Sequence, residues 1–244
     1  TMDYAGNPVD FEKIYDFANR HDLQFFDDSC HGLGGSYNGK EGGGIADMNV
    51  LSFHPVKPIT TGEGGAILTD SPEWAKYMRQ FRQHGITKDP ADFVNENEGP
   101  WYHEMQMLGH NFRLTDMQCA LGISQLKRID EFTAKRKAVA EKYARAFEGN
   151  PYFDIPKIRD GSESAWHLYA IRLKENLWNR KKEIFEKMAE KNIHLQVHYI
   201  PVYWHPYYAE LGYKKGLCPG AERFYKSEIS LPIYPHLSDE DQDY

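Results

Sequence analysis

The sequence predicts an α/β fold with a mainly parallel sheet, followed by a smaller α+β region. Helix-like and strand-like segments alternate in the first half of the chain, which is typical of a parallel sheet covered by helices. A long helical stretch near the middle separates this half from a strand–helix–strand pattern. The 244 residues include 41% apolar and 14% aromatic residues, which is enough for a sizeable core.

The first 70 residues contain one expected helix and several short strands. Residues 9–22 place apolar side chains at helical spacing on one face. The apolar runs 23–29, 48–53 and 66–70 are short, as buried strands are, and a glycine-rich turn precedes the last of them. Residues 1–6 are interpreted as the tail of a further strand.

A second helix is expected over residues 71–85. It opens with Ser-Pro-Glu, a common helix start, and His84-Gly85 is suited to cap its C-terminal end. Residues 88–110 are polar and irregular, and they are numerous enough to form a functional loop. These residues therefore predict a helix followed by a long excursion of the chain.

The second half begins with a long helix or a bent pair of helices over residues 114–150, ended by a Gly-Asn-Pro turn. Residues 165–173, 179–192 and 193–202 follow with the patterns of a strand, a helix and a strand. Ser238 with an aspartate three residues later has the spacing of a helix start, but the chain stops before a helix could run.

Composition argues against several classes of function. The net charge is −7 and the basic residues form no run, so we expect no nucleic-acid partner. No apolar run reaches the roughly 18 residues of a membrane span and no signal peptide is visible, so we expect a cytoplasmic protein. The three cysteines lie far apart and are interpreted as reduced thiols. His198 and His205 lack the spacing of a metal motif, so no metal is expected.

Polar residues follow the expected strands at positions where ligands bind in open α/β sheets, namely the carboxyl ends of the strands. These residues are Asp28 with His31, Ser52, and Lys57. A partly desolvated lysine can act as an amine nucleophile. A Schiff-base lysine with an aspartate for the ring nitrogen is the pairing used by pyridoxal phosphate (PLP) enzymes, and a serine can hold a phosphate oxygen. Residue types therefore suggest a cofactor hypothesis.

Each of these residues also has a simpler interpretation. A lone lysine after a strand is usually a solvated surface residue, and an aspartate there is more often a turn former. His31 taken singly is more often a satisfied, partly buried histidine than a catalyst. The glycines at 42–44 are usually just a turn, and without a following Gly-Lys-Ser/Thr they form no phosphate-binding P-loop.

A resemblance favours the cofactor hypothesis. The segments FFDDSCHGLGGSYNGK, LSFHPVKPITTGEGGAILTD, FRQHG and LGHNFRLTDMQCALGISQL resemble the DegT/DnrJ-type sugar aminotransferase family, whose members are fold type I PLP enzymes. The likeness runs from Tyr4 to Tyr244 in consistent order. It implies that residues 1–130 are the C-terminal portion of a large PLP-binding domain. Residues 131–244 would then be a linking helix and a small C-terminal domain truncated at its end.

The resemblance also assigns roles to individual residues. The family's Schiff-base lysine falls on Lys57, and the carboxylate that holds the pyridine nitrogen falls on Asp28. His31 matches the polar residue beside the cofactor's phenolic oxygen, and Ser52 matches the phosphate-binding serine. Asn111 matches an asparagine that reaches the cofactor phosphate of the neighbouring subunit, which implies a homodimer with shared active sites.

The C-terminal third narrows the expected substrate. The segments QVHYIPVYWHPYY and SLPIYPHLSDEDQ are similar to the transaminases of pseudaminic acid biosynthesis, which aminate a UDP-linked 4-keto-6-deoxy-N-acetylhexosamine. In that group His198 and Tyr199 would lie near the nucleotide sugar, and glutamate would be the amino donor. A dTDP-4-keto-6-deoxyhexose is the second candidate substrate.

Three further classes of protein would place different demands on these residues. A dehydratase-type relative carries histidine in place of the lysine, and a non-catalytic regulatory or sugar-binding relative would be expected to have lost Lys57 or Asp28. The third class is a plain α/β fragment with coincidental motifs. Relatives have a further N-terminal stretch, including a phosphate-binding turn and a stacking aromatic residue. We therefore expect this chain to be a fragment that is inactive by itself.

Overall fold

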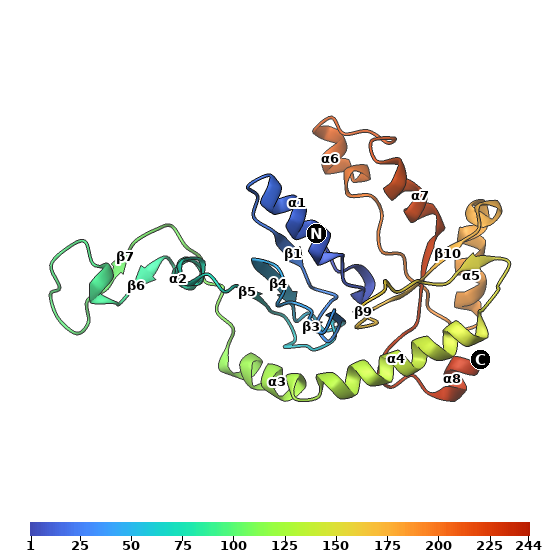
Figure 1. The fold of residues 1–244 in the computed structure, drawn as a ribbon, viewed down its shortest axis with the longest axis horizontal. Helices are drawn as coiled ribbons and strands as arrows, with labels where there is room; N and C mark the ends of the chain where they lie inside the picture. Colours follow the sequence, from blue (N-terminus) through green and yellow to red (C-terminus); the bar gives the residue numbers. More distant parts are fainter.

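The computed structural model describes residues 1–244, and its first sheet has the strand order β1-β4-β5 (Figure 1). β1 (Phe26–Asp28) and β4 (Met48–Ser52) are parallel, as predicted, with Asp28 opposite Val50. β5 (Gly65–Leu68) is antiparallel to β4. The sequence prediction did not foresee this reversal, and its physical reason is that the loop between them contains no helix to carry the chain back for a parallel strand.

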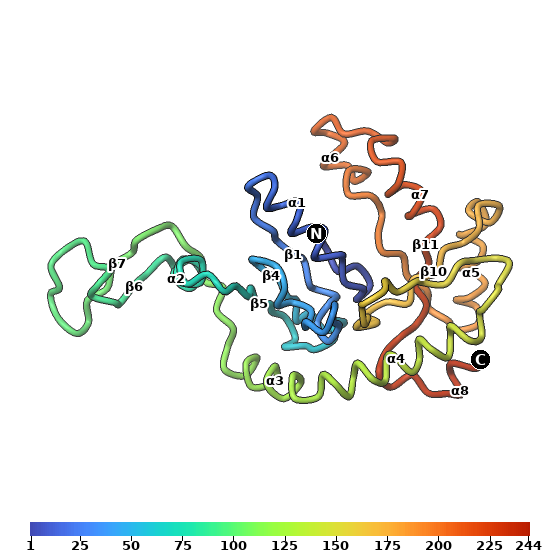
Figure 2. Tube along the Cα trace, viewed as in Figure 1, coloured from blue at the N-terminus to red at the C-terminus, as the bar shows by residue number.

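The start of the chain extends this sheet. Met2 forms a parallel bridge with Asp28, and the short 3-10 helix η1 (Tyr4–Gly6) follows at once. The predicted strand tail therefore exists as a single bridge. α1 (Phe11–Arg20) confirms the first predicted helix, and its N-terminus is capped by the Asp10 side chain, which accepts from the Lys13 N–H. Figure 2 shows the N-terminus lying beside β1.

A small sheet with the order β3-β2-β9 joins the two halves of the chain. It consists of β3 (Lys40–Glu41), β2 (Ser36–Tyr37) and β9 (Ser162–Glu163). β2 pairs with both of the other strands, although β9 lies far along the sequence. The glycine-rich stretch after β1 is thereby held against the C-terminal half.

Residues 71–112 form an arm that extends away from the first sheet (Figure 1). It contains α2 (Pro72–Phe81), η2 (Pro90–Asp92) and the antiparallel pair β6 (Ile86–Thr87) and β7 (Glu104–Met105). α2 ends at Phe81, and the Gly85 N–H donates to the Gln80 carbonyl in its last turn at 2.9 Å, so the cap predicted at His84-Gly85 is confirmed at Gly85. Both residues have a positive φ and turn the chain toward the returning strand, where the His84 N–H donates to the His110 carbonyl.

The long helical stretch is a bent pair, one of the two predicted forms. α3 (Asp116–Leu126) begins with a capping box made by Thr115 and Gln118, and α4 (Ile129–Ala146) follows after a two-residue break. The pair runs along one side of the molecule from the arm to the C-terminal half (Figure 1). Phe132, Val139 and Tyr143 are among the residues that α4 buries.

The second sheet is antiparallel, with the order β11-β10-β8. β10 (Tyr169–Leu173) confirms the strand predicted at 165–173, and it pairs with β8 (Phe153–Asp154) and β11 (Glu228–Leu231). α5 (Lys181–Glu190), preceded by η3 (Glu175–Arg180), confirms the predicted helix. The strand predicted at 193–202 is wrong, because only Gln196 bridges to the sheet, at Ser230.

Shorter helices complete the C-terminal half. They are η4 (Val202–Trp204), α6 (Pro206–Glu210), α7 (Pro219–Ser227) and α8 (Asp239–Asp243). Ser238 caps α8 by accepting from the Asp241 N–H, so the helix-start pattern is confirmed and a short helix does form. No helix in the structure has both the length and the apolar character needed to cross a membrane.

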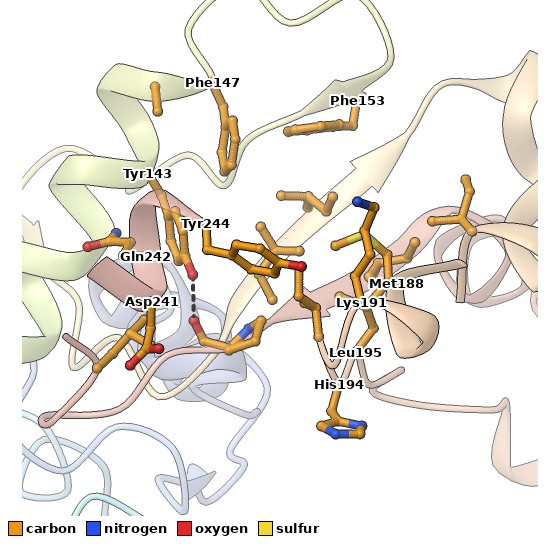
Figure 3. Close-up of a pocket in the computed structure, with 18 of the residues that line it drawn as sticks. Tyr143, Phe147, Phe153, Met188, Lys191, His194, Leu195, Asp241, Gln242 and Tyr244 are labelled. Atoms are coloured by element: carbon orange, nitrogen blue, oxygen red, sulfur yellow. Dashed lines mark hydrogen bonds between the residues drawn. The ribbon is translucent and has the colours of Figure 1, made fainter. Parts of the chain in front are cut away.

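A mainly apolar cavity lies in the C-terminal half, between α4, α5, α8 and the second sheet (Figure 3). Its volume is about 1150 Å³, and 17 of its 26 lining residues are hydrophobic. The hydroxyl of Tyr143 donates to the carbonyl of Pro232 at its wall, 3.0 Å away. None of the residues predicted from the sequence to bind cofactor or substrate lines this cavity.

A buried arginine connects α4 to the segments that flank the second sheet. Nη1 of Arg136 donates to the carbonyls of Trp166, His167 and Ile233 at 2.9–3.3 Å. Only 6% of Arg136 is exposed, and burial lowers its pKa to about 10. One charged group therefore satisfies carbonyls from two separate segments.

We expect Arg136→Met to destabilise the whole protein by about 3 kcal/mol, because three carbonyls lose a charged donor while the volume is kept. For a chain of this size that corresponds to a fall in Tm of roughly 6–12 °C, measurable by calorimetry. Lys137→Met, at an exposed neighbour on the same helix, is the control and should leave Tm nearly unchanged. Equal melting of the two variants would contradict the role assigned to Arg136.

Candidate functional site

The candidate site lies at the edge of the first sheet where β1 and β4 end. Asp28 is the last residue of β1, and Ser52 is the last residue of β4. Because Asp28 lies opposite Val50, and side chains two residues apart share a face, Asp28 and Ser52 lie on the same face of the sheet. Asp28 is exposed on that face, so its carboxylate is accessible to a ligand.

Lys57 lies in the loop that follows β4. Its own N–H donates to the His54 carbonyl at 2.9 Å, and the base of the loop is closed by hydrogen bonds between Phe53 and both Thr61 and Gly64. Gly64 has a φ of 154°, and a Cβ there would lie 2.5 Å from the Thr61 hydroxyl oxygen. Lys57 is half-buried, and this burial lowers the pKa of its amine.

His31 is held beside Lys57 in one protonation state. It is 1% exposed, and its Nδ1 accepts from the Ala5 N–H at 3.3 Å, so the neutral ring carries its proton on Nε2. Burial and the Lys57 charge lower the pKa of His31 to about 4, while the Asp28 carboxylate opposes this shift. The structure therefore brings Asp28, His31 and Lys57 together.

Two residues from the C-terminal half approach this group. Burial and the charge of Lys57 lower the pKa of His198. Burial and the charges of Glu228 and Asp28 raise the pKa of Tyr199. His198 and Tyr199, which the sequence predicted to bind substrate, are thus near enough for the charges of Lys57 and Asp28 to act on them, although they lie far away along the chain.

Ser52 and Asn111 have fewer contacts with the group. The Ser52 hydroxyl accepts only a long hydrogen bond from the His54 N–H, at 3.4 Å. Asn111 is exposed on the arm, where it forms a bridge with Gln83, and it makes no contact with Lys57 or Asp28. The structure therefore places Ser52 at the site's edge and Asn111 outside it.

Sequence reasoning missed several residues that support the site. The ring of His167 lies 4.2 Å from the ring of His31, and the hydroxyl of Tyr4 donates to the His198 carbonyl at 2.7 Å. Glu228 and Ser230 contact His198 from β11. No local signal marks these residues, because each reaches the site through a contact between distant segments.

A buried pair of carboxyl groups lies behind β1, on the face opposite Asp28. Asp3 and Asp27 are both fully buried. Asp27 accepts from the hydroxyls of Thr1 and Ser29, at 2.7 and 2.5 Å, and Asp3 accepts from the Val9 N–H at 3.1 Å. Burial, followed by the charge of Asp27, raises the pKa of Asp3 to about 7.

This raised pKa predicts a pH-dependent stability. Since the folded-state pKa lies above the unfolded value, Asp3 contributes stability that is complete below about pH 3.8 and is lost as the pH rises through about 7. Asp3→Asn keeps an acceptor for Val9 and does not titrate. Between pH 4 and pH 8 we expect the variant to gain on the order of 4 kcal/mol relative to wild type in urea unfolding of the whole protein. Parallel pH curves would contradict this.

Comparison with known proteins decides the family. The model of the DegT/DnrJ/EryC1/StrS aminotransferase family matches residues 1–244, which is the whole chain. The chain belongs to this family. The fold type expected from the sequence, that of type I PLP enzymes, is therefore confirmed.

Relatives within the DegT/DnrJ/EryC1/StrS family include a UDP-4-amino-4,6-dideoxy-N-acetyl-beta-L-altrosamine transaminase from Campylobacter jejuni. It is 39% identical over 237 residues, covering 97% of this chain and 60% of the relative. The structure of Helicobacter pylori PseC, an aminotransferase of pseudoaminic acid biosynthesis, is 40% identical with a TM-score of 0.89, covering 99% of this chain and 62% of PseC.

A third similar protein is known in a cofactor-bound form. This putative sugar aminotransferase from Streptococcus pneumoniae (Spr1654), in its pyridoxamine phosphate (PMP) form, is 29% identical with a TM-score of 0.91, covering 100% of this chain and 66% of that protein. The cofactor class expected from the sequence is thus one that this family uses. The chain spans about 60% of the length of the curated relative from Campylobacter.

Proposed function

We propose that the whole protein is a cytoplasmic, PLP-dependent aminotransferase that transfers an amino group from glutamate to a 4-keto sugar nucleotide. The single observation that carries this proposal is the convergence of Asp28, His31 and Lys57 at the end of β1 in a chain of the sugar aminotransferase family. The names of the relatives support a UDP-linked 4-keto-6-deoxy-N-acetylhexosamine as the acceptor, and hence a role in pseudaminic acid biosynthesis.

The residues present fit PLP. The cofactor needs an amine to bind its aldehyde, and Lys57 is a half-buried amine whose pKa is lowered. It needs a carboxylate for its ring nitrogen, and Asp28 offers one on an open face of the sheet. His31 presents an Nε2–H donor, because Ala5 occupies the other ring nitrogen.

Each residue then has a defined task. PLP, when bound, supplies an electron sink for the carbon next to the amino group. Lys57 Nζ holds the cofactor until the amino donor displaces it, and it then moves a proton at short range as a general base. The Asp28 carboxylate keeps the ring nitrogen protonated. Ser52 and the partner subunit, through the residue equivalent to Asn111, are proposed to bind the phosphate in a homodimer with shared sites.

Borohydride reduction tests the proposed attachment. In the whole protein loaded with PLP, we expect reduction to fix the cofactor to one peptide, the one that contains Lys57, as measured by peptide mass spectrometry. Lys181, which is also partly desolvated, lies in the same digest as an internal control. Labelling of a different lysine, or of none, would refute the role of Lys57.

Substrate choice requires a separate experiment. The whole protein should aminate UDP-linked 4-keto-6-deoxy-N-acetylhexosamines, with glutamate as donor, in preference to dTDP-linked 4-keto-6-deoxyhexoses. A preference for a dTDP sugar would overturn the assignment to pseudaminic acid biosynthesis and leave the aminotransferase proposal standing. Transamination of neither class would favour a non-catalytic regulatory or sugar-binding role, against which the retention of Lys57 and Asp28 now argues.

A further inference from the structure

A chain of hydrogen bonds runs from β11 to the His198 ring. Glu228 is completely buried, and its Oε2 accepts from the His198 backbone N–H at 2.9 Å. The hydroxyl of Ser230 donates to Oε1 of Glu228 at 2.5 Å. The same hydroxyl oxygen lies 2.8 Å from Nδ1 of His198.

This chain determines which nitrogen of His198 carries the proton. A serine hydroxyl has one proton, and the Ser230 proton is directed to Glu228, whose carboxylate can only accept. The Ser230 oxygen must therefore accept from His198, so the ring proton is on Nδ1. Nε2 is left with a free lone pair, and no other group of the protein donates a hydrogen bond to it.

The charged and titratable groups around these hydrogen bonds are consistent with a neutral His198 ring that carries its proton on Nδ1. Burial and the charge of Lys57 lower the pKa of His198, which favours the neutral ring. Burial raises the pKa of Glu228, while its hydrogen bonds to Ser230 and His198 and the charge of Lys181 oppose that shift. The Tyr4 hydroxyl holds the His198 carbonyl, so the residue is fixed at its N–H, its carbonyl and its ring.

We propose that Glu228 and Ser230 are positioning residues that fix His198 as a hydrogen-bond acceptor, at Nε2, for a donor group of the bound substrate. This inference rests on the proposed function. The donor group is a sugar hydroxyl or the amino group of the amino donor, since both offer an O–H or N–H. A carboxylate or phosphate oxygen, which can only accept, is disfavoured at Nε2 by its lone pair.

A same-size substitution reverses this arrangement. In Glu228→Gln the side-chain oxygen must still accept from the His198 N–H, so the amide NH₂ faces Ser230. The Ser230 oxygen then accepts from the amide and its hydroxyl donates to His198 Nδ1. The ring proton moves to Nε2, and the acceptor becomes a donor.

Nitrogen-15 NMR of histidine-labelled whole enzyme measures the tautomer directly. We expect His198, assigned by its loss in His198→Gln, to carry its proton on Nδ1 in the wild type and on Nε2 in Glu228→Gln. Glu222→Gln is the matched control, because Glu222 accepts from Tyr203 and Trp204 and has no part in the chain. A wild-type proton on Nε2, or no change in Glu228→Gln, overturns the inference.

Kinetics then identify the substrate group. The absorbance of the cofactor follows the two half-reactions separately, one with the amino donor and one with the keto sugar. We expect Glu228→Gln to raise KM roughly 5- to 100-fold in one half-reaction, the one whose substrate donates to Nε2, with little change in the other. A changed tautomer with unchanged kinetics in both half-reactions overturns the inference.

Borohydride labelling separates this inference from the proposed function. If the proposed function is correct, Lys57 is labelled in wild type and in Glu228→Gln alike. Loss of labelling in the wild type refutes the proposed function. Normal labelling with unchanged kinetics in Glu228→Gln refutes only the roles given to Glu228 and Ser230.

Discussion

Replacement of Lys57 by alanine is expected to lower kcat of the whole enzyme by roughly 10³-fold or more, because the variant loses both the amine that holds the cofactor and the general base. Lys57 is the lysine whose charge acts on His31 and on His198, lowering the pKa of both rings. Steady-state assay with glutamate and the preferred keto sugar measures the loss.

The control for this variant is Lys40→Ala, at an exposed residue of β3, which should keep wild-type kcat. Small primary amines added to Lys57→Ala should restore part of the activity, because they can enter the space left by the side chain and carry the proton. Such rescue would show that the variant is folded. A Lys57→Ala enzyme that kept more than about a tenth of wild-type kcat would contradict the assigned role.

Many helices and strands could be predicted, because the spacing of apolar residues along the sequence reflects the face that each element buries. α1 and α5 each have apolar side chains at helical spacing, and the short apolar runs in the sequence correctly located β1 and β4. Both strands bury alternate residues and not the whole run, because one face of this sheet is open. The antiparallel direction of β5 could not be predicted, because direction depends on pairing with β4 and not on the residues of the strand itself.

The strand wrongly predicted at 193–202 has a specific cause. Its alternation of apolar and polar residues is that of a half-buried strand, and Gln196 does pair with Ser230. At His198, however, the backbone N–H donates to the side chain of Glu228 instead of to a neighbouring strand. Local pattern and structure therefore diverge where the chain turns toward the candidate site, which is where such conflicts are expected.

The candidate site was predictable only where its residues lie near strand ends. Asp28 and Lys57 lie near strand ends and could be proposed from position and type, with the family resemblance supplying their roles. Glu228 is a charged residue at a buried strand position, so it weakened the apolar signal of β11 and gave no indication of its partner. Its contact with His198 depends on two segments that only the folded chain brings together.

Asp28→Asn is expected to lower kcat by roughly 10²- to 10³-fold while Lys57 remains able to hold the cofactor. The asparagine keeps the size of the side chain, and its oxygen can still accept from the Cys30 N–H, as Oδ1 of Asp28 does at 3.1 Å. What is lost is the negative charge that keeps the ring nitrogen protonated, so the chemical step is slowed more than binding.

A comparison of two measurements isolates that charge. Borohydride labelling of Lys57 should persist in Asp28→Asn while kcat falls, a combination that unfolding cannot produce. Asp47→Asn is the matched control, since Asp47 precedes β4 at the opposite end of the sheet and its carboxylate accepts from the Phe25 N–H. If Asp28→Asn kept the wild-type kcat, the proposed role of the Asp28 carboxylate in catalysis would be wrong. Loss of labelling and kcat together would make Asp28 a residue that the site needs in order to form.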